Sequence, residues 1–108
     1  MSINKLVEQA HTNAVEHGWW EVDRPFGELI ALCHSELSEA LEEYRNGLAM
    51  TTTYIKNDKP EGIPIELADV LIRIFDICGR YKIDLESAVK RKMAYNETRP
   101  HRHGGKVI

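Results

Sequence analysis

Apolar residues recur at helical spacing in four segments of this chain. The expected helices cover residues 2–17, 25–46, 63–79 and 84–98. In each segment apolar positions lie three or four residues apart, which is the pattern of a helix with one buried face. In the second segment the residues expected to face inward are Phe26, Ile30, Cys33, Leu37, Ala40 or Leu41, and Tyr44. The pattern predicts an all-α fold resembling a four-helix bundle, and the 108 residues fit a single domain, 1–108.

The third segment differs from the others because it is apolar on nearly every side. Between residues 65 and 78 the polar side chains are Glu66, Asp69, Arg73 and Asp76, and their spacing places them on one stripe. A helix with so little polar surface has to be covered on most sides. Three other helices of this length cannot cover it, and we therefore expect a homo-oligomer, either a homodimer or a homotetramer, with this helix at the interface.

The remaining segments carry weaker signals. Residues 51–55 are the only β-favouring run, and they stand alone between two expected helices. We expect a loop over residues 48–61, and a loop of that length in so small a domain is often functional. The tail, residues 99–108, is basic and irregular.

Charge and composition exclude several classes of protein. The net charge of −3 gives no broad basic surface for a nucleic acid, and no apolar run reaches the length of a membrane span. Cys33 and Cys78 have no neighbouring cysteine at zinc spacing, and we expect free, buried thiols. The sequence is typical of a cytoplasmic protein without a nucleic-acid or membrane partner.

Two acidic pairs with the same spacing lie on the second and third expected helices. They are Glu36 with Glu39, and Glu66 with Asp69. Residues three apart share a helix face, so each helix presents two carboxylates that repel each other. A divalent cation between the helices would remove this repulsion, and four oxygen donors favour Mg²⁺, or Mn²⁺, over zinc. We expect a metal site on these four side chains, and a phosphorylated ligand on the metal.

Two other interpretations of the acidic residues are open at this point. One is a structural salt bridge between Asp69 and Arg73, which follows four residues later on the same helix. The other is a di-iron carboxylate site, which in helical bundles uses two Glu-x-x-His motifs. One such spacing is present, Glu8-Gln9-Ala10-His11, and no second motif accompanies it. The sequence favours magnesium over both.

A stripe on the fourth expected helix is a candidate for binding an anionic ligand. Lys92, Asn96 and Arg99 are spaced by four and three residues, which places them along one helix face. Lysine and arginine donate to phosphate oxygens, and the alternative is an ordinary solvated helix end, where cations are also favourable. Further candidates for substrate binding are Lys106 in the glycine-rich tail, and Trp19 and Trp20, whose rings can stack on a nucleobase. The alternative for both tryptophans is a place in the core.

These motifs, in this order, resemble those of the all-α nucleoside triphosphate pyrophosphohydrolases of the MazG-like group, which includes dCTP pyrophosphatases and dimeric dUTPases. The family pattern Glu-x-x-Glu, a variable spacer and Glu-x-x-Asp falls on the two acidic pairs. A later Lys-x-x-x-Asn-x-x-Arg falls on residues 92–99, and the ending His103-Gly104-Gly105-Lys106 is similar to the tails of some members. Many members have a second glutamate where this chain has Ser35. The resemblance covers residues 19–106.

The resemblance implies an enzyme that hydrolyses a nucleoside triphosphate to a monophosphate and pyrophosphate, as in clearing unwanted nucleotides. It implies Mg²⁺ on the four acidic residues, while Ser35 in place of the second glutamate leaves the family's general base open. We expect Glu36 and Glu39 to be the catalytic residues, with Glu39 accepting a proton from water. Lys92 and Arg99 would neutralise the departing pyrophosphate, and Asn96 would position a phosphate or the sugar. The alternative function is a non-catalytic helical module for oligomerisation or interaction.

Overall fold

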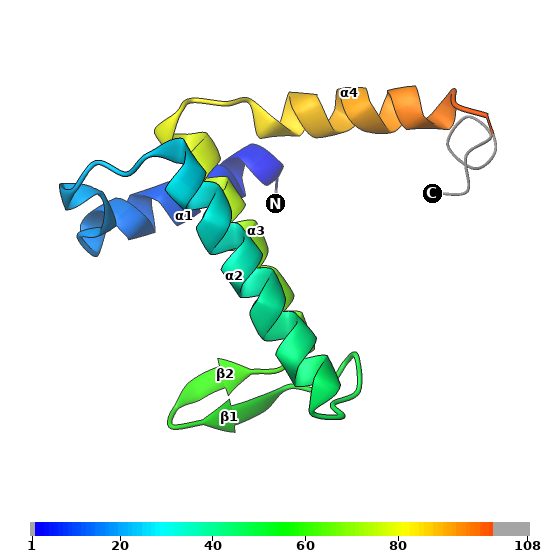
Figure 1. The fold of residues 1–108 in the computed structure, drawn as a ribbon. Coiled ribbons are helices and arrows are strands. Elements are labelled where there is room, and N and C mark those ends of the chain that lie inside the picture. The colour runs from blue at the N-terminus through cyan, green and yellow to red at the C-terminus, as the bar shows by residue number, and fades with distance from the viewer. Residues whose placement is uncertain (1, 101–108) are drawn as a thin grey trace.

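Helices dominate the fold, as the apolar pattern predicts (Figure 1). The computed structural model describes residues 2–100. Its elements in chain order are α1 (Ile3–Glu16), a 3-10 turn η1 (Trp19–Glu21), α2 (Phe26–Arg45), β1 (Tyr54–Lys56), β2 (Lys59–Glu61), α3 (Ile63–Arg80) and α4 (Leu85–Glu97). The expected helix bounds are therefore confirmed to within one residue at each end. No helix among the described residues is both long and apolar enough to cross a membrane.

Local sequence signals account for where the helices begin. The Ser2 side chain accepts a hydrogen bond from the backbone N–H of Lys5, and Asp84 accepts one from Ser87 in the same way. Such caps satisfy backbone donors that have no partner inside the helix. Pro64 occupies the first turn of α3, where the missing N–H of proline costs no hydrogen bond.

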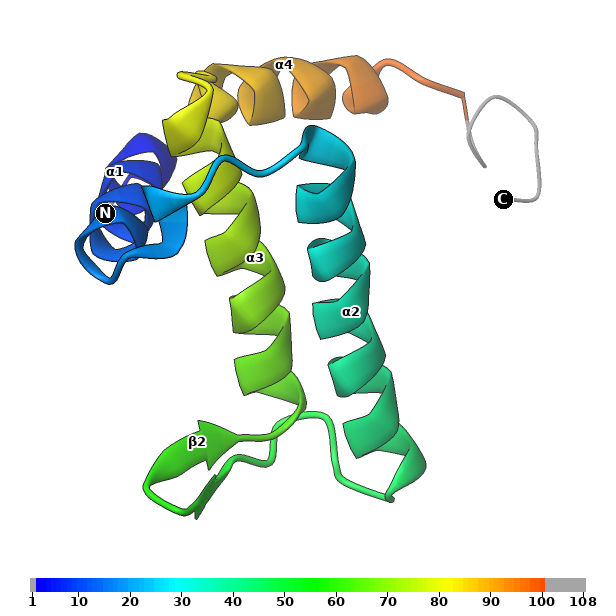
Figure 2. The same ribbon diagram turned by 60° about the vertical axis from the view of Figure 1, so that its left-hand side comes forward.

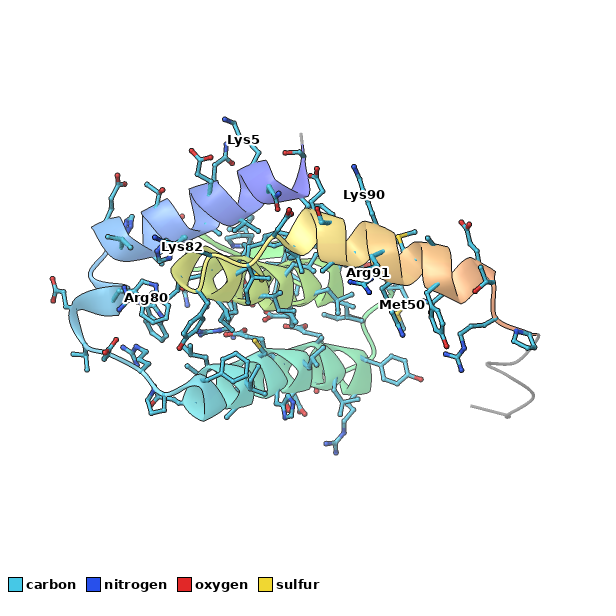
Figure 3. All side chains as sticks on the ribbon, turned by 90° about the horizontal axis from the view of Figure 1, so that it is seen from above. Lys5, Met50, Arg80, Lys82, Lys90 and Arg91 are labelled. Atoms are coloured by element: carbon cyan, nitrogen blue, oxygen red, sulfur yellow. The ribbon has the colours of Figure 1, made fainter. Side chains whose placement is uncertain are left out.

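α3 is the central helix of the fold. α1 and α2 pack against it from different sides, as the view from above shows (Figure 3). Its contact with α2 forms the small core, in which Leu29, Cys33 and Ile77 are buried. Its contact with α1 is close because Gly79 lacks a side chain. A Cβ atom at that position would collide with the side chain of His11.

The expected loop at residues 48–61 is wrong for its second half, which forms a β-hairpin. β1 and β2 pair antiparallel, and Tyr54 lies opposite Glu61. Asn57 and Asp58 form the two-residue turn, both with positive φ, which these residue types tolerate and which suits the twist of a hairpin. The hairpin lies at the end of the α2–α3 pair where α3 begins (Figure 2).

The expected four-helix bundle is wrong in its fourth member. α4 lies across the other end of the fold and extends away from α2 and α3 (Figures 1 and 2). Its start is tied to α1: Asn4 donates to Asp84 at 2.9 Å and accepts from the backbone of Glu86 at 3.2 Å. The short turn between α3 and α4, with Lys82 at positive φ, directs the chain sideways.

A row of large apolar residues on α2 is exposed, although the sequence pattern placed it in the core. Cys33 and Ala40 are buried as expected, whereas the others in the row are 36–57% exposed. Successive residues of a helix are about 100° apart around its axis. On α2 the exposed apolar residues therefore lie within about 60° of one another around the axis, well away from Glu36. On α3, two leucines about half exposed lie roughly opposite the polar stripe. We call this combined surface the apolar face; its members are Phe26, Ile30, Leu37, Leu41, Tyr44, Leu67 and Leu71.

Candidate metal centre

Three of the four predicted metal ligands meet between α2 and α3. Oxygen atoms of Glu36, Glu66 and Asp69 lie within 4.8 Å of one another. The antiparallel packing of the two helices produces this meeting, because it places the middle of α2 beside the first turns of α3. Glu66 is buried, while Glu36 and Asp69 are half-buried. We call these three residues the acidic cluster.

The fourth predicted ligand, Glu39, lies at the edge of this cluster. Its side chain is exposed, and it is not among the oxygen atoms that converge within 4.8 Å. A cavity of about 310 Å³ lies at the acidic cluster, and Glu39 lines it together with the cluster and with Lys59 and Glu61 of the hairpin. Glu39 therefore lies beside the acidic cluster and is open to water.

A second group of carboxylates adjoins the acidic cluster and was not among the residues predicted from the sequence. Glu43, Glu61 and Glu66 also bring oxygen atoms within 4.8 Å of one another, so that Glu66 belongs to both groups. The hydroxyl of Tyr54 donates to both oxygens of Glu43, at 2.9 and 3.1 Å. The seven-residue spacing from Glu36 puts Glu43 on the same face of α2 and was the available signal.

Burial and mutual repulsion make it unfavourable for these carboxylates to be charged. Burial raises the pKa of Glu66 to about 7, and a hydrogen bond with Glu61 and the nearby Asp69 add to the effect. Burial and Glu36 also raise the pKa of Asp69, while Lys59 and Arg73 oppose the rise. The group thus needs either protons or a cation. Its donors are all carboxylate oxygens, which fit a hard divalent ion such as Mg²⁺.

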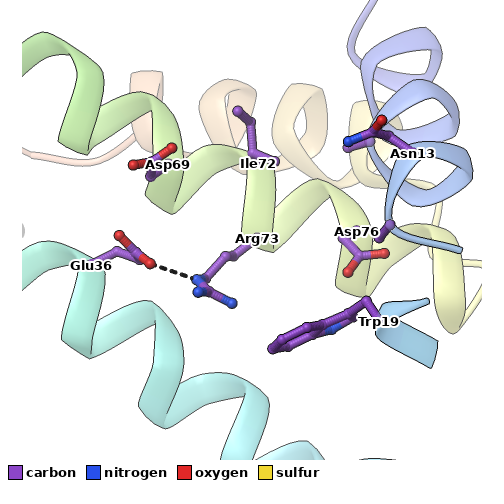
Figure 4. Close-up of a pocket in the computed structure, with 9 residues that line it drawn as sticks. Asn13, Trp19, Glu36, Asp69, Ile72, Arg73 and Asp76 are labelled. Carbon is purple, nitrogen blue, oxygen red and sulfur yellow. Dashed lines mark hydrogen bonds and ion pairs between the residues drawn. The ribbon is translucent and has the colours of Figure 1, made fainter. Parts of the chain in front are cut away.

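Arg73 forms an ion pair across the helices, not along its own helix. Its Nε donates to Oε1 of Glu36 at 2.9 Å (Figure 4). The proposed salt bridge between Arg73 and Asp69 does not appear among the ion pairs of residues 2–100. One predicted metal ligand therefore already has a cationic partner.

A second cavity, of about 330 Å³, continues from the acidic cluster toward α1. It is lined by Glu36, Asp69 and Arg73 on one side and by Trp19 and Asp76 further along (Figure 4). The guanidinium of Arg24 lies 3.7 Å from the centre of the Trp19 ring. Trp19 therefore lines this cavity beside the carboxylates, with one face of its ring against Arg24.

Trp20 has a different place from Trp19. Its indole N–H donates to Asp76 at 2.9 Å, and its ring packs against the buried core. Asp76 is only 8% exposed and also accepts a hydrogen bond from Nδ1 of His11 at 2.8 Å. A buried carboxylate needs such partners, and both come from outside α3. Asp76 belongs to the polar stripe seen in the sequence, but its role had no sequence signal.

The pairing of His11 with Asp76 also bears on the di-iron alternative. Neither group of converging carboxylates among residues 2–100 includes a histidine. His11, the histidine of the Glu-x-x-His spacing, is part-buried on α1 with its ring edge toward Trp20. The arrangement therefore favours an ion that prefers oxygen ligands over iron.

The predicted anion-binding residues of α4 lie away from the acidic cluster in the same chain. Lys92 and Asn96 are exposed, and Arg99 is half-buried just after the helix. Lys92 and Arg99 both lie near the ring of Tyr95, at 4.9 and 5.8 Å from its centre. None of the three lines either cavity described above. Lys106 lies outside the described residues.

Comparisons with protein-family models, with curated protein sequences and with solved structures gave no match to this chain.

Proposed function

We propose that this protein is a Mg²⁺-dependent nucleoside triphosphate pyrophosphohydrolase with a MazG-like fold. The observation that carries the proposal is the acidic cluster, in which three carboxylates from two helices converge at one end of a cavity. This arrangement supports a divalent cation, and the adjoining space supports a ligand with an apolar, aromatic part. A nucleotide combines both features. The sequence resemblance supplies the choice of reaction.

The metal site would use Glu36, Glu66 and Asp69, with Mn²⁺ as an alternative to Mg²⁺. A bound divalent ion polarises a phosphoryl oxygen and lowers the pKa of a coordinated water. The carboxylates would hold and orient the ion, and Glu66 would give up its proton when the ion binds. Because Glu66 has a pKa of about 7, the proton it loses is weakly held.

Glu39 fits the role of proton acceptor better than the buried members of the site. It is exposed and lines the cavity beside the acidic cluster, so a water molecule can reach it. A carboxylate that water can reach is able to act as a general base. Glu36, which we expect to act as both ligand and catalytic residue, lies three residues before it on α2.

The cavity beside Trp19 is proposed to bind the nucleobase. Its volume of about 330 Å³ lies at the lower end of the range typical of small-molecule sites. The indole ring of Trp19 offers a stacking surface, and Asn13 on α1 brings an amide that can donate to or accept from a base edge. Trp20, predicted as a second stacking residue, is proposed instead to support the cavity through Asp76.

A second copy of the chain is proposed to cover the apolar face. Seven large residues there are 36–57% exposed, which is unusual for a monomer. The radius of gyration is 16.4 Å, against about 13 Å for a compact chain of this length. α4 has 13 residues and few contacts, and isolated helices of this length are marginal in water. All three features are explained if two copies pack together.

Charge complementarity supports a second copy rather than another protein. α2 carries five glutamates and one arginine, whereas α4 carries Lys90, Arg91 and Lys92 in succession. In an oligomer α4 of one copy can approach α2 of the other. Lys92, Asn96 and Arg99 would then serve the partner's acidic cluster, which explains why they lie far from it in their own chain.

The enzymatic proposal is tested by measuring pyrophosphate release from the common ribo- and deoxynucleoside triphosphates with and without Mg²⁺. We expect Mg²⁺-dependent turnover of at least one of them. Glu66→Gln and Asp69→Asn should each lower it by at least about a thousandfold, because each removes a charged ligand. Glu42→Gln is the matched control, since Glu42 is an exposed α2 residue paired with Arg45, and should leave turnover unchanged.

Normal turnover in both ligand variants would contradict the proposal. The exposed apolar face favours one alternative, a non-catalytic interaction module. Such a module would oligomerise but would show no Mg²⁺-dependent nucleotide binding in calorimetry.

A further inference from the structure

Arg73 lies where the acidic cluster meets the Trp19 cavity. Its side chain, 32% exposed, donates to Glu36, whose side chain is 19% exposed. Its guanidinium carbon is 5.4 Å from the centre of the Trp19 ring. Arg73 therefore borders both the proposed metal ligands and the space proposed for the nucleobase (Figure 4).

The pairing of Arg73 creates a competition at Glu36. A guanidinium and a divalent cation both bind carboxylate oxygens, and the two positive charges repel each other at short distance. Arginine stays charged at every pH at which the protein is folded, so it cannot relieve this repulsion by losing a proton. Without metal, Arg73 provides part of the positive charge that the acidic cluster needs. With metal bound, this contribution becomes unfavourable.

We propose that Arg73 is a substrate-binding residue that the metal releases. In the metal-free protein its guanidinium is held by Glu36; binding of a divalent cation frees it, and it then donates to a phosphate oxygen of the nucleotide. A guanidinium suits this role because its N–H groups match phosphate oxygens in pairs. The inference rests on the proposed function, and it adds an order of binding in which metal precedes nucleotide.

The release is tested directly by following the Nε–H of Arg73 by NMR in protein labelled with ¹⁵N-arginine. The signal is assigned by its absence in Arg73→Lys. We expect slow exchange with solvent in the metal-free protein, fast exchange after Mg²⁺ is added, and a new slowly exchanging signal with Mg²⁺ and inorganic pyrophosphate. The internal control is Arg24, whose Nε donates to the backbone oxygen of Trp19 and should not respond to Mg²⁺ alone.

Calorimetry gives an independent measure of the competition. In Arg73→Gln, Mn²⁺ should bind about fivefold more tightly, because one nearby positive charge is gone. Pyrophosphate binding to the Mn²⁺-loaded variant should weaken about tenfold, because a charged donor is lost. Arg80→Gln, which removes an arginine paired with the exposed Asp23, is the matched control and should change neither value more than twofold.

The possible failures are distinguishable. An Arg73 Nε–H that stays protected after Mg²⁺ binds, or weaker Mn²⁺ binding by Arg73→Gln, would mean that Arg73 only positions Glu36, and would overturn this inference alone. Absence of Mn²⁺ binding to the unaltered protein would overturn the proposed function together with it.

Discussion

The two sides of the α2–α3 pair differ in chemistry although they belong to the same two helices. On one side Glu36, Glu66 and Asp69 converge beside Arg73, and two cavities there share Glu36 and Asp69 in their linings. On the other side the apolar face exposes large side chains and carries no charged residue among its members. The core between the two sides is small, with Leu29, Cys33 and Ile77 as its buried centre.

This difference is the basis of our two proposals, one for each side. Crowded carboxylates need either protons or a cation, because burial makes their charged forms costly. Exposed leucines need a covering surface, because water is unfavourable around them. In our proposals a metal ion meets the first need and a second copy of the chain the second. The two can be separated experimentally, since each is confined to one side.

The largest expected effect comes from placing charge on the apolar face. Leu41→Glu combined with Leu71→Glu should convert the proposed oligomer into a monomer, because burying two unpaired carboxylates at an interface is strongly unfavourable. Light scattering coupled to size-exclusion chromatography measures the change. Hydrogen exchange should also speed up along α4, whose length makes it marginal without a partner.

Ile55→Glu is the control for this experiment, since Ile55 is 69% exposed on the hairpin and outside the apolar face. It should leave the oligomer intact. A monomeric unaltered protein, or a double variant that still oligomerises, would show that the apolar face is not the interface.

An intermediate effect is expected from Glu66 on the acidic side. In the unfolded chain the carboxyl group of Glu66 loses its proton near pH 4.5, whereas in the folded protein it keeps this proton up to its raised pKa of about 7. Between these values the unfolded state binds fewer protons, so the free energy of unfolding falls as pH rises, by at most about 3 kcal/mol. Urea denaturation of metal-free protein from pH 4.5 to 8 measures the fall.

Two comparisons sharpen this result. Glu66→Gln should flatten the dependence, because glutamine does not titrate, and Mg²⁺ at pH 8 should restore stability to the unaltered protein by binding the folded state. If the free energy of unfolding of Glu66→Gln fell equally with rising pH, the pH dependence would have to come from other groups than Glu66.

The smallest expected effect is a change in the pKa of Tyr54, which joins the hairpin to Glu43 on the acidic side. The hydrogen bond to Glu43 raises the pKa of Tyr54 above its ordinary value of 10. Glu43→Gln should return the pKa toward 10, because a neutral side chain stabilises the protonated phenol less. NMR titration of the Tyr54 ring carbon measures it. Glu42→Gln, one residue earlier and paired with Arg45, should leave the Tyr54 pKa as it was.

The sequence predicted the helices well because their signals are local. Apolar spacing, the caps at Ser2 and Asp84, and the proline at the start of α3 act within a few residues. The spacing within each acidic pair likewise indicated that its members share a helix face. The hairpin was missed because three-residue strands are too short to show alternation, although Asn57 and Asp58 carried a usable turn signal.

Partners that depend on packing were beyond local patterns. Arg73 lies four residues from Asp69 in sequence, yet its ion pair is with Glu36 on another helix. Asp76 is held by His11 and Trp20, which come from earlier parts of the chain. Glu43 and Glu61 join Glu66 only because the hairpin folds over the end of α2 and α3.

The sequence by itself determined which residues become helical and which of them share a face, because backbone hydrogen bonding and side-chain periodicity act over short stretches. Only the tertiary structure decided which faces meet. The antiparallel packing of α2 and α3 brings Glu36 to Glu66 and Asp69, and the sideways turn after α3 leaves α4 and the apolar face uncovered. The reason is that the angle and register of helix packing depend on contacts summed over many distant residues, with each contact contributing little.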